Sequence, residues 1–317
     1  MIRSLLGWGS PAGLTARLTV LIFHRVLRQP DALSPGEVHA SQFESICAWL
    51  ASWFNVLPLD EAAQRLAQGS LPARAAAISF DDGYADNCTV ALPILQRHGL
   101  NATFFISTGF LDGGIMWNDR VIESVRRASS PALDLRGAGG LDLGLHPLGC
   151  NEDRRQAAGS LLRRIKHLPP QQREAAVGAI VEAAAVGLPG DLMLTTPQLL
   201  ALRDAGMGLG AHTVSHPILA TLDRDVAVRE ISVGRDQLQA LLGQRVGLFA
   251  YPNGKPGDDF TDEHVDLVRQ AGFDAAVTTA WGAANSRSDP FRLPRFTPWD
   301  RSKLRFGLRL ADNLRRA

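Results

Sequence analysis

The segment from Ala75 to Asn87 constrains this 317-residue chain more than any other, because it joins a buried strand to two adjacent acids. It reads Ala-Ala-Ala-Ile-Ser-Phe-Asp-Asp-Gly-Tyr-Ala-Asp-Asn, so small and apolar residues lead directly into Asp81 and Asp82. Strands covered on both faces have such continuous apolar runs, and in parallel α/β folds functional groups gather at their C-terminal ends. The pattern favours a metal-assisted hydrolase. An ordinary acidic turn, in which Gly83 allows a positive φ, is the alternative.

The rest of the chain alternates short apolar runs with helical patterns, as expected for a parallel sheet covered by helices. Runs that are typical of strands begin near residues 19, 55, 75, 102, 207, 246 and 273. Seven such strands predict an α/β fold, an incomplete (β/α)7-type barrel. Residues 113–190 depart from this alternation and predict an inserted, mostly helical subdomain, with helices over 118–128, 151–167 and 170–186. We therefore expect one domain over residues 1–317 that contains this insertion.

Composition and charge narrow the classes of function. The formal net charge of +1 predicts neither a nucleic-acid binder nor an acidic tail. The three cysteines, Cys47, Cys88 and Cys150, are widely spaced and form no C-x-x-C pair, so they predict neither disulfides nor a thiolate zinc site. We see no convincing signal peptide and no run of about 20 apolar residues, and we therefore expect a cytoplasmic protein.

The C-terminal segment 301–317 is strongly basic. Six Lys and Arg residues stand against one acid, Asp312, a balance of +5, and Leu304, Leu308 and Leu314 lie among them. One interpretation is an amphipathic helix attracted to an anionic membrane surface, which would make the protein membrane-associated. The other is a solvated terminal helix that packs on the barrel, the more usual behaviour of such charge runs. The oligomeric state is not predicted.

A second motif, Gly-Ala-His-Thr-Val-Ser-His-Pro, follows the strand predicted over 207–211 and places His212 and His216 four residues apart. This spacing predicts two imidazoles on one face of a single helical turn, within reach of one metal ion. Two His and one carboxylate leave open positions on zinc, where water becomes a nucleophile near neutral pH. The spacing alone is a weak signal, but both motifs follow strands and should meet at one sheet edge. One acid of the Asp81-Asp82 pair could then ligate while the other acts as a base.

Three motifs in order, Ser-Phe-Asp-Asp-Gly, His-Thr-Val-Ser-His and Phe-Ala-Tyr-Pro-Asn-Gly-Lys, resemble those of the polysaccharide deacetylases, carbohydrate esterase family 4, also called the NodB-homology domain. The resemblance covers Thr19 to about Pro298. The opening Phe-His-Arg-Val and the inserted helices make the chain more similar to bacterial exopolysaccharide deacetylases than to compact members. The family implies a distorted (β/α) barrel and metal-dependent removal of acetyl groups from N-acetylated sugars, so an acetylated amino-sugar polymer or oligosaccharide is the expected partner.

Carried over to this sequence, the resemblance implies that Asp81 is the general base and that Asp82, His212 and His216 are metal ligands. Zinc suits these donors, and cobalt or nickel would fit the same nitrogen and oxygen atoms. The backbone N–H of Asn253, which stands where the family motif usually has an aromatic residue, is expected to stabilise the oxyanion.

The sequence departs from the family pattern at two positions. Ala250 stands where the third motif commonly has an Arg that pairs with the catalytic Asp. A late Leu-x-His motif, which supplies the acid, is replaced by Leu-Pro-Arg ending at Arg295. Arg is a poor proton donor, so we hypothesise that Arg295 supplies the cation missing at Ala250. His24, at the end of the first strand, is the candidate acid, with a structural role or proton return from Asp81 as alternatives.

Aromatic residues near the strand ends are candidates for contact with sugar rings. The predicted substrate-binding residues are Tyr84, Tyr251 and Pro252, and Tyr84 directly follows the Asp-Asp-Gly turn. Core filling is the alternative role for each aromatic side chain. The departures at Ala250 and Arg295 also leave open a weakened sugar-binding module, and the same metal site could instead serve a deacylase of another amide or an O-acetyl ester.

Overall fold

The computed structural model describes residues 2–137 and 140–316, so Met1 of the predicted domain and Ala317 of the predicted basic tail lie outside the described residues. The chain folds into two compact units. Unit 1 comprises Met1–Gln29, Val38–Leu111 and Leu194–Ala317, and unit 2 comprises Pro30–Glu37 and Asp112–Met193. The predicted insertion, 113–190, thus corresponds to most of unit 2, and the sequence did not reveal that residues 30–37 join it.

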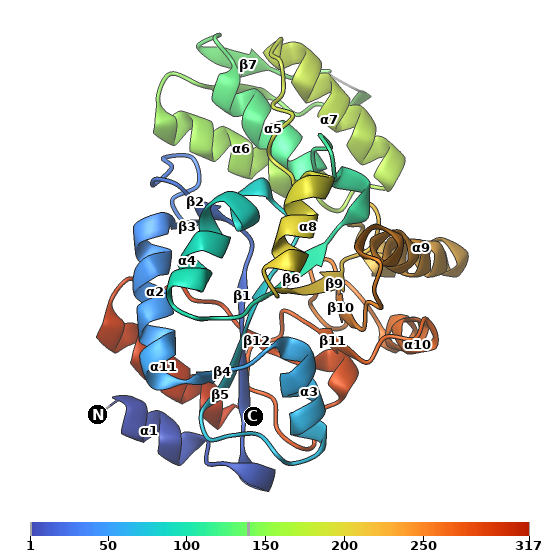
Figure 1. Ribbon diagram of the computed structural model, residues 1–317. Coiled ribbons are helices and arrows are strands. Elements are labelled where there is room, and N and C mark those ends of the chain that lie inside the picture. The colour runs from blue at the N-terminus through green and yellow to red at the C-terminus, as the bar shows by residue number, and fades with distance from the viewer. Residues whose placement is uncertain (1, 138–139, 317) are drawn as a thin grey trace. The chain divides into compact units, whose positions relative to one another are not determined.

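Unit 1 is built on a parallel sheet of eight strands (Figure 1). Seven form a continuous order: β11 (Ala275–Val277), β10 (Leu248–Ala250), β9 (Gly208–Ala211), β6 (Thr103–Ile106), β5 (Ala75–Phe80), β1 (Leu18–Phe23) and β12 (Arg295–Phe296). The eighth, β4 (Asn55–Val56), pairs with β5 beside this path. A parallel bridge between Val277 and Leu293, just ahead of β12, brings the two ends of the order together. The sheet is therefore a nearly closed, distorted (β/α) barrel, as expected.

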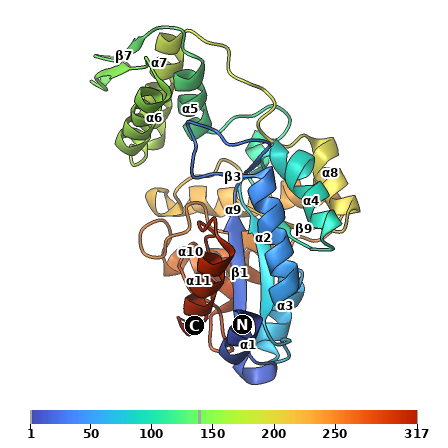
Figure 2. The same cartoon turned by 90° about the vertical axis from the view of Figure 1, so that its left-hand side faces the viewer.

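All seven predicted strands are present in this sheet, and β12 is the strand of the sheet that the sequence did not predict. The helices of unit 1 connect and cover the strands (Figures 1 and 2). They are α1 (Ile2–Gly9), α2 (Ala40–Trp53), α3 (Leu59–Ala67), α4 (Leu92–Arg97), α8 (Thr196–Asp204), α9 (Arg224–Leu242), α10 (Asp262–Gln270) and α11 (Lys303–Arg315). A π-helical turn over Asn87–Ala91 precedes α4, and a two-residue parallel pair joins β2 (Val26–Leu27) to β3 (Val38–His39).

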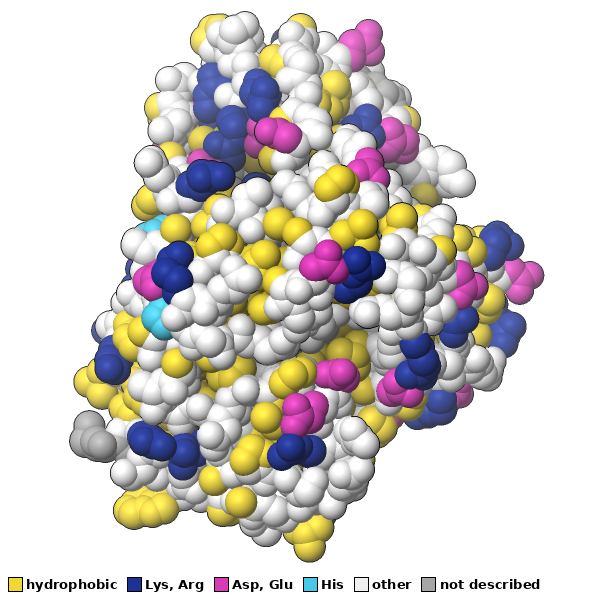
Figure 3. All heavy atoms as spheres, viewed as in Figure 1, with side chains coloured by type: hydrophobic (Ala, Val, Ile, Leu, Met, Phe, Trp, Pro, Cys, Tyr) yellow, Lys and Arg dark blue, Asp and Glu magenta, His cyan; other side chains and the backbone are white. Residues whose placement is uncertain are grey.

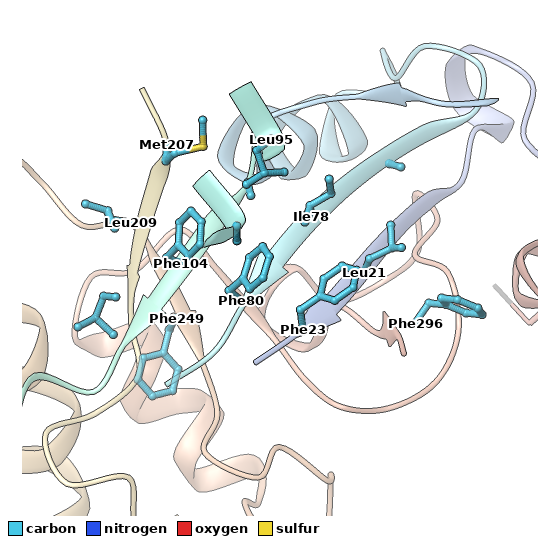
Figure 4. Close-up of a cluster of buried hydrophobic side chains, with 14 of the residues drawn as sticks. Leu21, Phe23, Ile78, Phe80, Leu95, Phe104, Met207, Leu209, Phe249 and Phe296 are labelled. Carbon is cyan, nitrogen blue, oxygen red and sulfur yellow. The ribbon is translucent and has the colours of Figure 1, made fainter. Parts of the chain in front are cut away.

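The central strands β1, β5 and β6 are buried on both faces, and their alternate side chains point to opposite sides of the sheet. Residues such as Val20, Ala77 and Phe105 pack in one cluster with side chains of α3. The other face packs beneath the helices, and Figure 4 shows its aromatic and aliphatic side chains, among them Leu21, Phe23, Ile78, Phe80, Phe104 and Phe249. The side chains on the two faces of the sheet form two close-packed layers. This packing holds the carboxyl ends of the strands in fixed relative positions.

Unit 2 has its own apolar core. Helices α5 (Trp117–Arg127), α6 (Asn151–Ile165) and α7 (Pro170–Ala184) pack through buried side chains that include Val121, Leu161 and Ile180. The three predicted helices are thus present. An antiparallel pair, β7 (Ala132–Asp134) and β8 (Leu145–Pro147), lies between α5 and α6 in a segment whose sequence shows no clear period.

Charged side chains of both signs are interspersed on the face of unit 1 shown in Figure 3, in keeping with the formal net charge of +1. Within residues 2–137 and 140–316, no helix combines the length and the apolar content that crossing a membrane requires.

Candidate metal centre and active site

Three side chains that could hold a metal ion lie together at the carboxyl edge of the sheet. Asp82 follows β5, and His212 and His216 follow β9. One donor atom from each lies within 4.8 Å of the others. The Nε2 atoms of His212 and His216 are 3.4 and 3.3 Å from Oδ1 of Asp82, a buried oxygen with no hydrogen-bond partner among the described residues. A buried acceptor that faces two imidazoles fits a divalent cation.

The backbone of β10 fixes the orientation of His212. Nδ1 of this imidazole lies 2.7 Å from the carbonyl oxygen of Ala250. A carbonyl oxygen only accepts hydrogen bonds, so Nδ1 carries the proton, and a neutral imidazole keeps a lone pair on Nε2 that could bind a metal ion. Such a hydrogen bond to the far ring nitrogen is typical of His residues that bind metals.

The loop that carries the two histidines is not the helical turn that their spacing predicted, and that prediction was wrong. Thr213 and His216 adopt φ values of 65° and 53°, in the left-handed region. The Oγ1 atom of Thr213 donates to the carbonyl of His212 and accepts a hydrogen bond of 3.1 Å from the N–H of His216. The imidazoles converge nevertheless, with ring centroids 4.8 Å apart.

Helix α9 supports this loop at two positions that the sequence did not single out. One carboxylate oxygen of Glu230 accepts hydrogen bonds of 2.9 Å from the N–H groups of Val214 and Ser215, and the other accepts one of 2.7 Å from Oγ of Ser215. One turn later, a Cβ at Gly234 would lie 2.8 Å from the carbonyl carbon of Thr213. Glycine at this position therefore permits the close approach of the helix to the loop.

Asp81 lies at the same edge and is paired with Arg295 of β12. Nη1 and Nη2 of Arg295 donate hydrogen bonds of 2.7 Å to the two carboxylate oxygens of Asp81. Nε donates to the carbonyl of Thr278 at 2.8 Å, and Nη1 also donates to Oγ of Ser79 at 3.2 Å. Both members of the pair are buried, so water screens the bidentate interaction little. This contact is the one expected if Arg295 takes the place of the Arg that is missing at position 250.

The charges of the site keep both acids ionised. Burial by itself would raise the pKa of Asp81 and of Asp82. The guanidinium beside Asp81 and the two imidazoles beside Asp82 outweigh burial and hold both pKa values below the ordinary value. Burial lowers the pKa of His216 to about 4. Burial acts in the same direction on His212, but the two carboxylates outweigh it and raise the pKa of this imidazole.

His24 directly follows β1, with an exposed side chain, and its charge is near enough to lower the pKa of Asp81 and Asp82. The segment that follows Gly83 holds the backbone of His24, because Nδ2 of Asn87 donates a hydrogen bond of 2.9 Å to the carbonyl of His24. The neighbouring Asp86 accepts hydrogen bonds from Nε of Arg25 and the N–H of Val26. The segment after the Asp-Asp-Gly turn therefore positions the candidate acid, a role that the sequence did not show.

Backbone strain is concentrated at this edge. The described chain has seven non-glycine residues with positive φ, and four of them are Asp82, Thr213, His216 and Asn253. Asn253 follows β10, and its N–H donates to no acceptor among residues 2–137 and 140–316. Left-handed conformations are costly for residues with a Cβ, and they cluster where function demands a particular geometry.

The three predicted substrate contacts are all buried. The ring of Tyr251 stacks on Phe260 with centroids 3.9 Å apart, and its hydroxyl donates to the carbonyl of Phe291. Tyr84 is also buried, and the guanidinium of Arg25 lies 4.7 Å from its ring centroid. Pro252 is buried as well. Burial favours core filling as the role of the two aromatic residues, and their contact with a sugar ring stays a prediction.

Comparisons with known proteins indicate the family. The family model described as "Polysaccharide deacetylase" matches residues 68–137 and 176–276, more than half of the chain. A Bacillus subtilis (strain 168) protein, "Putative polysaccharide deacetylase YxkH", is 32% identical over 93 residues, which cover 29% of this chain and 32% of that protein. The match therefore spans about a third of the length of this curated relative.

Two solved structures are similar in fold. The deacetylase PplD of Streptococcus pyogenes, in complex with acetate, has a TM-score of 0.59 at 19% identity, over 89% of this chain and 92% of that one. IcaB from Ammonifex degensii has a TM-score of 0.60 at 17% identity, over 95% and 98% of the two chains. The family model includes both the Asp81-Asp82 and the His212-His216 motifs. The chain therefore belongs to the polysaccharide deacetylase family.

Proposed function

We propose that the protein is a metal-dependent hydrolase that removes N-acetyl groups from an amino-sugar polysaccharide, or from its precursor. The observation that carries this proposal is the position of Asp81. This ionised carboxylate, held by Arg295, directly precedes a ligand in a cluster of one carboxylate and two imidazoles. Two adjacent residues can therefore have different roles, with Asp81 as the base and Asp82 as a metal ligand.

Asp82, His212 and His216 would hold the ion through Oδ1 and the two Nε2 atoms. Zinc fits this donor set best, and cobalt or nickel share its preferences. A divalent ion bound there would polarise the acetamide carbonyl and lower the pKa of water to near neutrality.

Asp81 then takes a proton from the attacking water. Each of its carboxylate oxygens accepts one hydrogen bond from Arg295 and retains a further lone pair, so the carboxylate is oriented and still able to accept a proton. The guanidinium favours the ionised form of Asp81 before the reaction begins.

Two other groups complete the reaction. The N–H of Asn253 donates a hydrogen bond to the oxyanion that develops on the former acetamide carbonyl. His24 protonates the amide nitrogen as the carbon–nitrogen bond breaks, which releases acetate and the free amine. The exposed position of His24 at the same sheet edge supports this role, and proton return from Asp81 is the alternative.

The substrate class rests on the family and on the similar structures. The family model describes polysaccharide deacetylases, and the similar structure of PplD contains acetate, the small product that this reaction would release. An acetylated amino-sugar polymer or oligosaccharide is thus the substrate to test first.

Acetate release by the metal-loaded protein across a panel of acetylated glycans tests the proposal, with Asp81→Asn as the inactive control. We expect release from at least one N-acetylated amino-sugar oligomer, loss of release after chelation and recovery when metal is restored. Release of acetate from O-acetyl esters alone would indicate that the protein is an esterase and not an N-deacetylase. Binding of metal and glycan without release from any substrate would indicate a sugar-binding module instead.

A further inference from the structure

Helix α11 packs on unit 1 through one of its sides. Phe306, Leu310 and Leu314 are buried, and the ring of Phe306 lies 5.6 Å from that of Trp49 on α2. Helix α1 packs closely beside it, because a Cβ at Gly307 would lie 2.8 Å from the side chain of Ile2. This packing agrees with the interpretation of the basic tail as a helix that packs on the barrel.

The outward side of α11 is also apolar. Leu304 and Leu308 are 53% and 49% exposed and lie one turn apart on the same face. Trp299, just before the helix, is 70% exposed, and Trp281 is 42% exposed. The guanidinium of Arg309 lies 5.0 Å from the ring centroid of Trp299 and 5.6 Å from that of Trp281. We call these four exposed side chains along α11, two leucines on one flank and two tryptophans beside Arg309, the α11 face: Leu304, Leu308, Trp281 and Trp299.

Basic residues lie along α11 together with these apolar side chains. Arg309 forms an ion pair with Asp300, and Arg316 forms one with Asp312. Further basic residues lie along the same segment: Arg301, Lys303, Arg305 and Arg315. Within the described chain, no carboxylate lies at ion-pair distance from Arg305 or Arg315, so these two guanidinium groups are available to an anion outside the molecule.

We propose that the α11 face docks the protein on an anionic lipid bilayer, which goes beyond the hydrolytic function. Leucine side chains enter the boundary between headgroups and acyl chains, tryptophan rings lie at the headgroup level, and arginines contact lipid phosphates. A nucleic acid would satisfy the arginines but leave Leu304 and Leu308 in water. The combination of exposed leucines, tryptophans and cations therefore favours the membrane surface.

Co-sedimentation of the full chain with lipid vesicles tests this docking. We expect binding to vesicles of phosphatidylcholine with phosphatidylglycerol, little binding to phosphatidylcholine alone, and weaker binding as salt is raised. The double variant Leu304→Ser/Leu308→Ser should lower the vesicle affinity on the order of tenfold, because it removes apolar area from the contact. The double variant Arg305→Glu/Arg315→Glu should lower the affinity for anionic vesicles, because it places negative charges beside the lipid phosphates.

The matched control is Val233→Ser/Leu241→Ser on α9, whose native side chains are 39% and 37% exposed. This control should keep the wild-type affinity, and unfolding curves should show that all variants are folded. Three results would overturn the proposal: no binding to anionic vesicles, equal binding to both vesicle types, or an equal loss in the control. Binding to duplex DNA without binding to vesicles would assign the cations to a different partner.

Discussion

Arg295 donates one hydrogen bond of 2.7 Å to each carboxylate oxygen of Asp81, across a separation of 214 residues in the sequence. Strand register explains the contact. Arg295 pairs with Val20 of β1, and Val20 pairs with Ala77 of β5, the strand that ends just before Asp81. The long side chain reaches toward the carboxyl edge, so the two-residue strand β12 provides a cation beside Asp81 that Ala250 on β10 lacks.

Replacing Arg295 should impair catalysis without removing the metal site. We expect Arg295→Ala to lower kcat by on the order of 100-fold, because Asp81 loses both its orientation and its counter-charge. The unpaired buried carboxylate should also cost about 3–5 kcal/mol of stability. Arg295→Lys keeps the charge but loses the bidentate contact, so its kcat should fall with less destabilisation. The measurements are kcat, bound metal per chain and the unfolding temperature.

A second cation could restore part of this loss. Ala250 belongs to the same buried cluster as Phe105, and the Phe105 ring lies 5.9 Å from the guanidinium of Arg295. Ala250→Arg, added to Arg295→Ala, should therefore recover part of the lost kcat. Arg292→Ala, which removes a cation that pairs with Asp262 at the surface, is the matched control and should leave kcat unchanged. Full activity of Arg295→Ala alone would remove Arg295 from the mechanism.

The fold was largely predictable because seven of the eight strands have apolar runs bounded by helical patterns. The eighth, β12, is too short to show an apolar run, since one of its two residues is charged, and so its pairing with β1 was invisible. The role of Arg295 came instead from the chemistry of two departures from a family pattern. The hairpin of β7 and β8 was missed for the same reason as β12, since each of its strands has three residues.

The clustering of the candidate ligands was predictable, and the contacts that support them were less so. Asp82, His212 and His216 follow strands in recognisable motifs, but the sequence did not show that a left-handed loop brings the imidazoles together. A strand end also does not reveal the direction of a side chain, and Tyr251 therefore proved to be buried. Glu230 has no signal in a single sequence, because an acid in an amphipathic helix is ordinarily a solvated surface residue.

Glu230 should matter for metal affinity. Glu230→Ala removes three hydrogen bonds from the backbone and side chain of the loop between His212 and His216, so the ligands lose their fixed separation. We expect metal affinity to fall about 10- to 100-fold, the usual effect of losing a group that orients ligands. Competition with a chelator measures this affinity, and the absorption spectrum of the cobalt-loaded protein reports the altered geometry.

Asp236→Asn on the same helix is the control, because Asp236 pairs with Arg235 away from the loop. Its metal affinity should equal that of the wild type. Gly234→Ala should reproduce the effect of Glu230→Ala, since the added Cβ would displace the backbone of Thr213. Unchanged affinity in both Glu230→Ala and Gly234→Ala would show that the loop holds its conformation without α9.

His24→Gln tests the identity of the proton donor. If His24 protonates the leaving amine, the variant should lose the basic limb of the pH dependence of kcat, and kcat itself should fall about 100-fold. Metal content should not change, because His24 is not among the three clustered ligands. If the variant keeps both the basic limb and a wild-type kcat, His24 is not the proton donor, and Asp81 would protonate the leaving amine instead.

The ion pair between Asp31 and Arg126 should stabilise unit 2 in a pH-dependent manner. Nη1 and Nη2 of Arg126 donate hydrogen bonds of 2.9 and 2.6 Å to the two carboxylate oxygens of Asp31. These bonds hold the pKa of Asp31 below its ordinary value of 3.8. A carboxyl with a depressed pKa in the folded state contributes stability that is fully present above its unfolded pKa and is lost as pH falls through the folded value.

Asp31→Asn should therefore destabilise the protein by about 1 kcal/mol or less near pH 6, the range of partly exposed ion pairs. The difference from the wild type should shrink as pH is lowered below about 4, because the wild-type Asp31 then becomes protonated. Calorimetric unfolding over this pH range measures the effect. In a double-mutant cycle, Arg126→Ala and Asp31→Asn should show a coupling energy, although Arg126 also donates a hydrogen bond to Glu123, and fully additive losses would show that the two residues act independently.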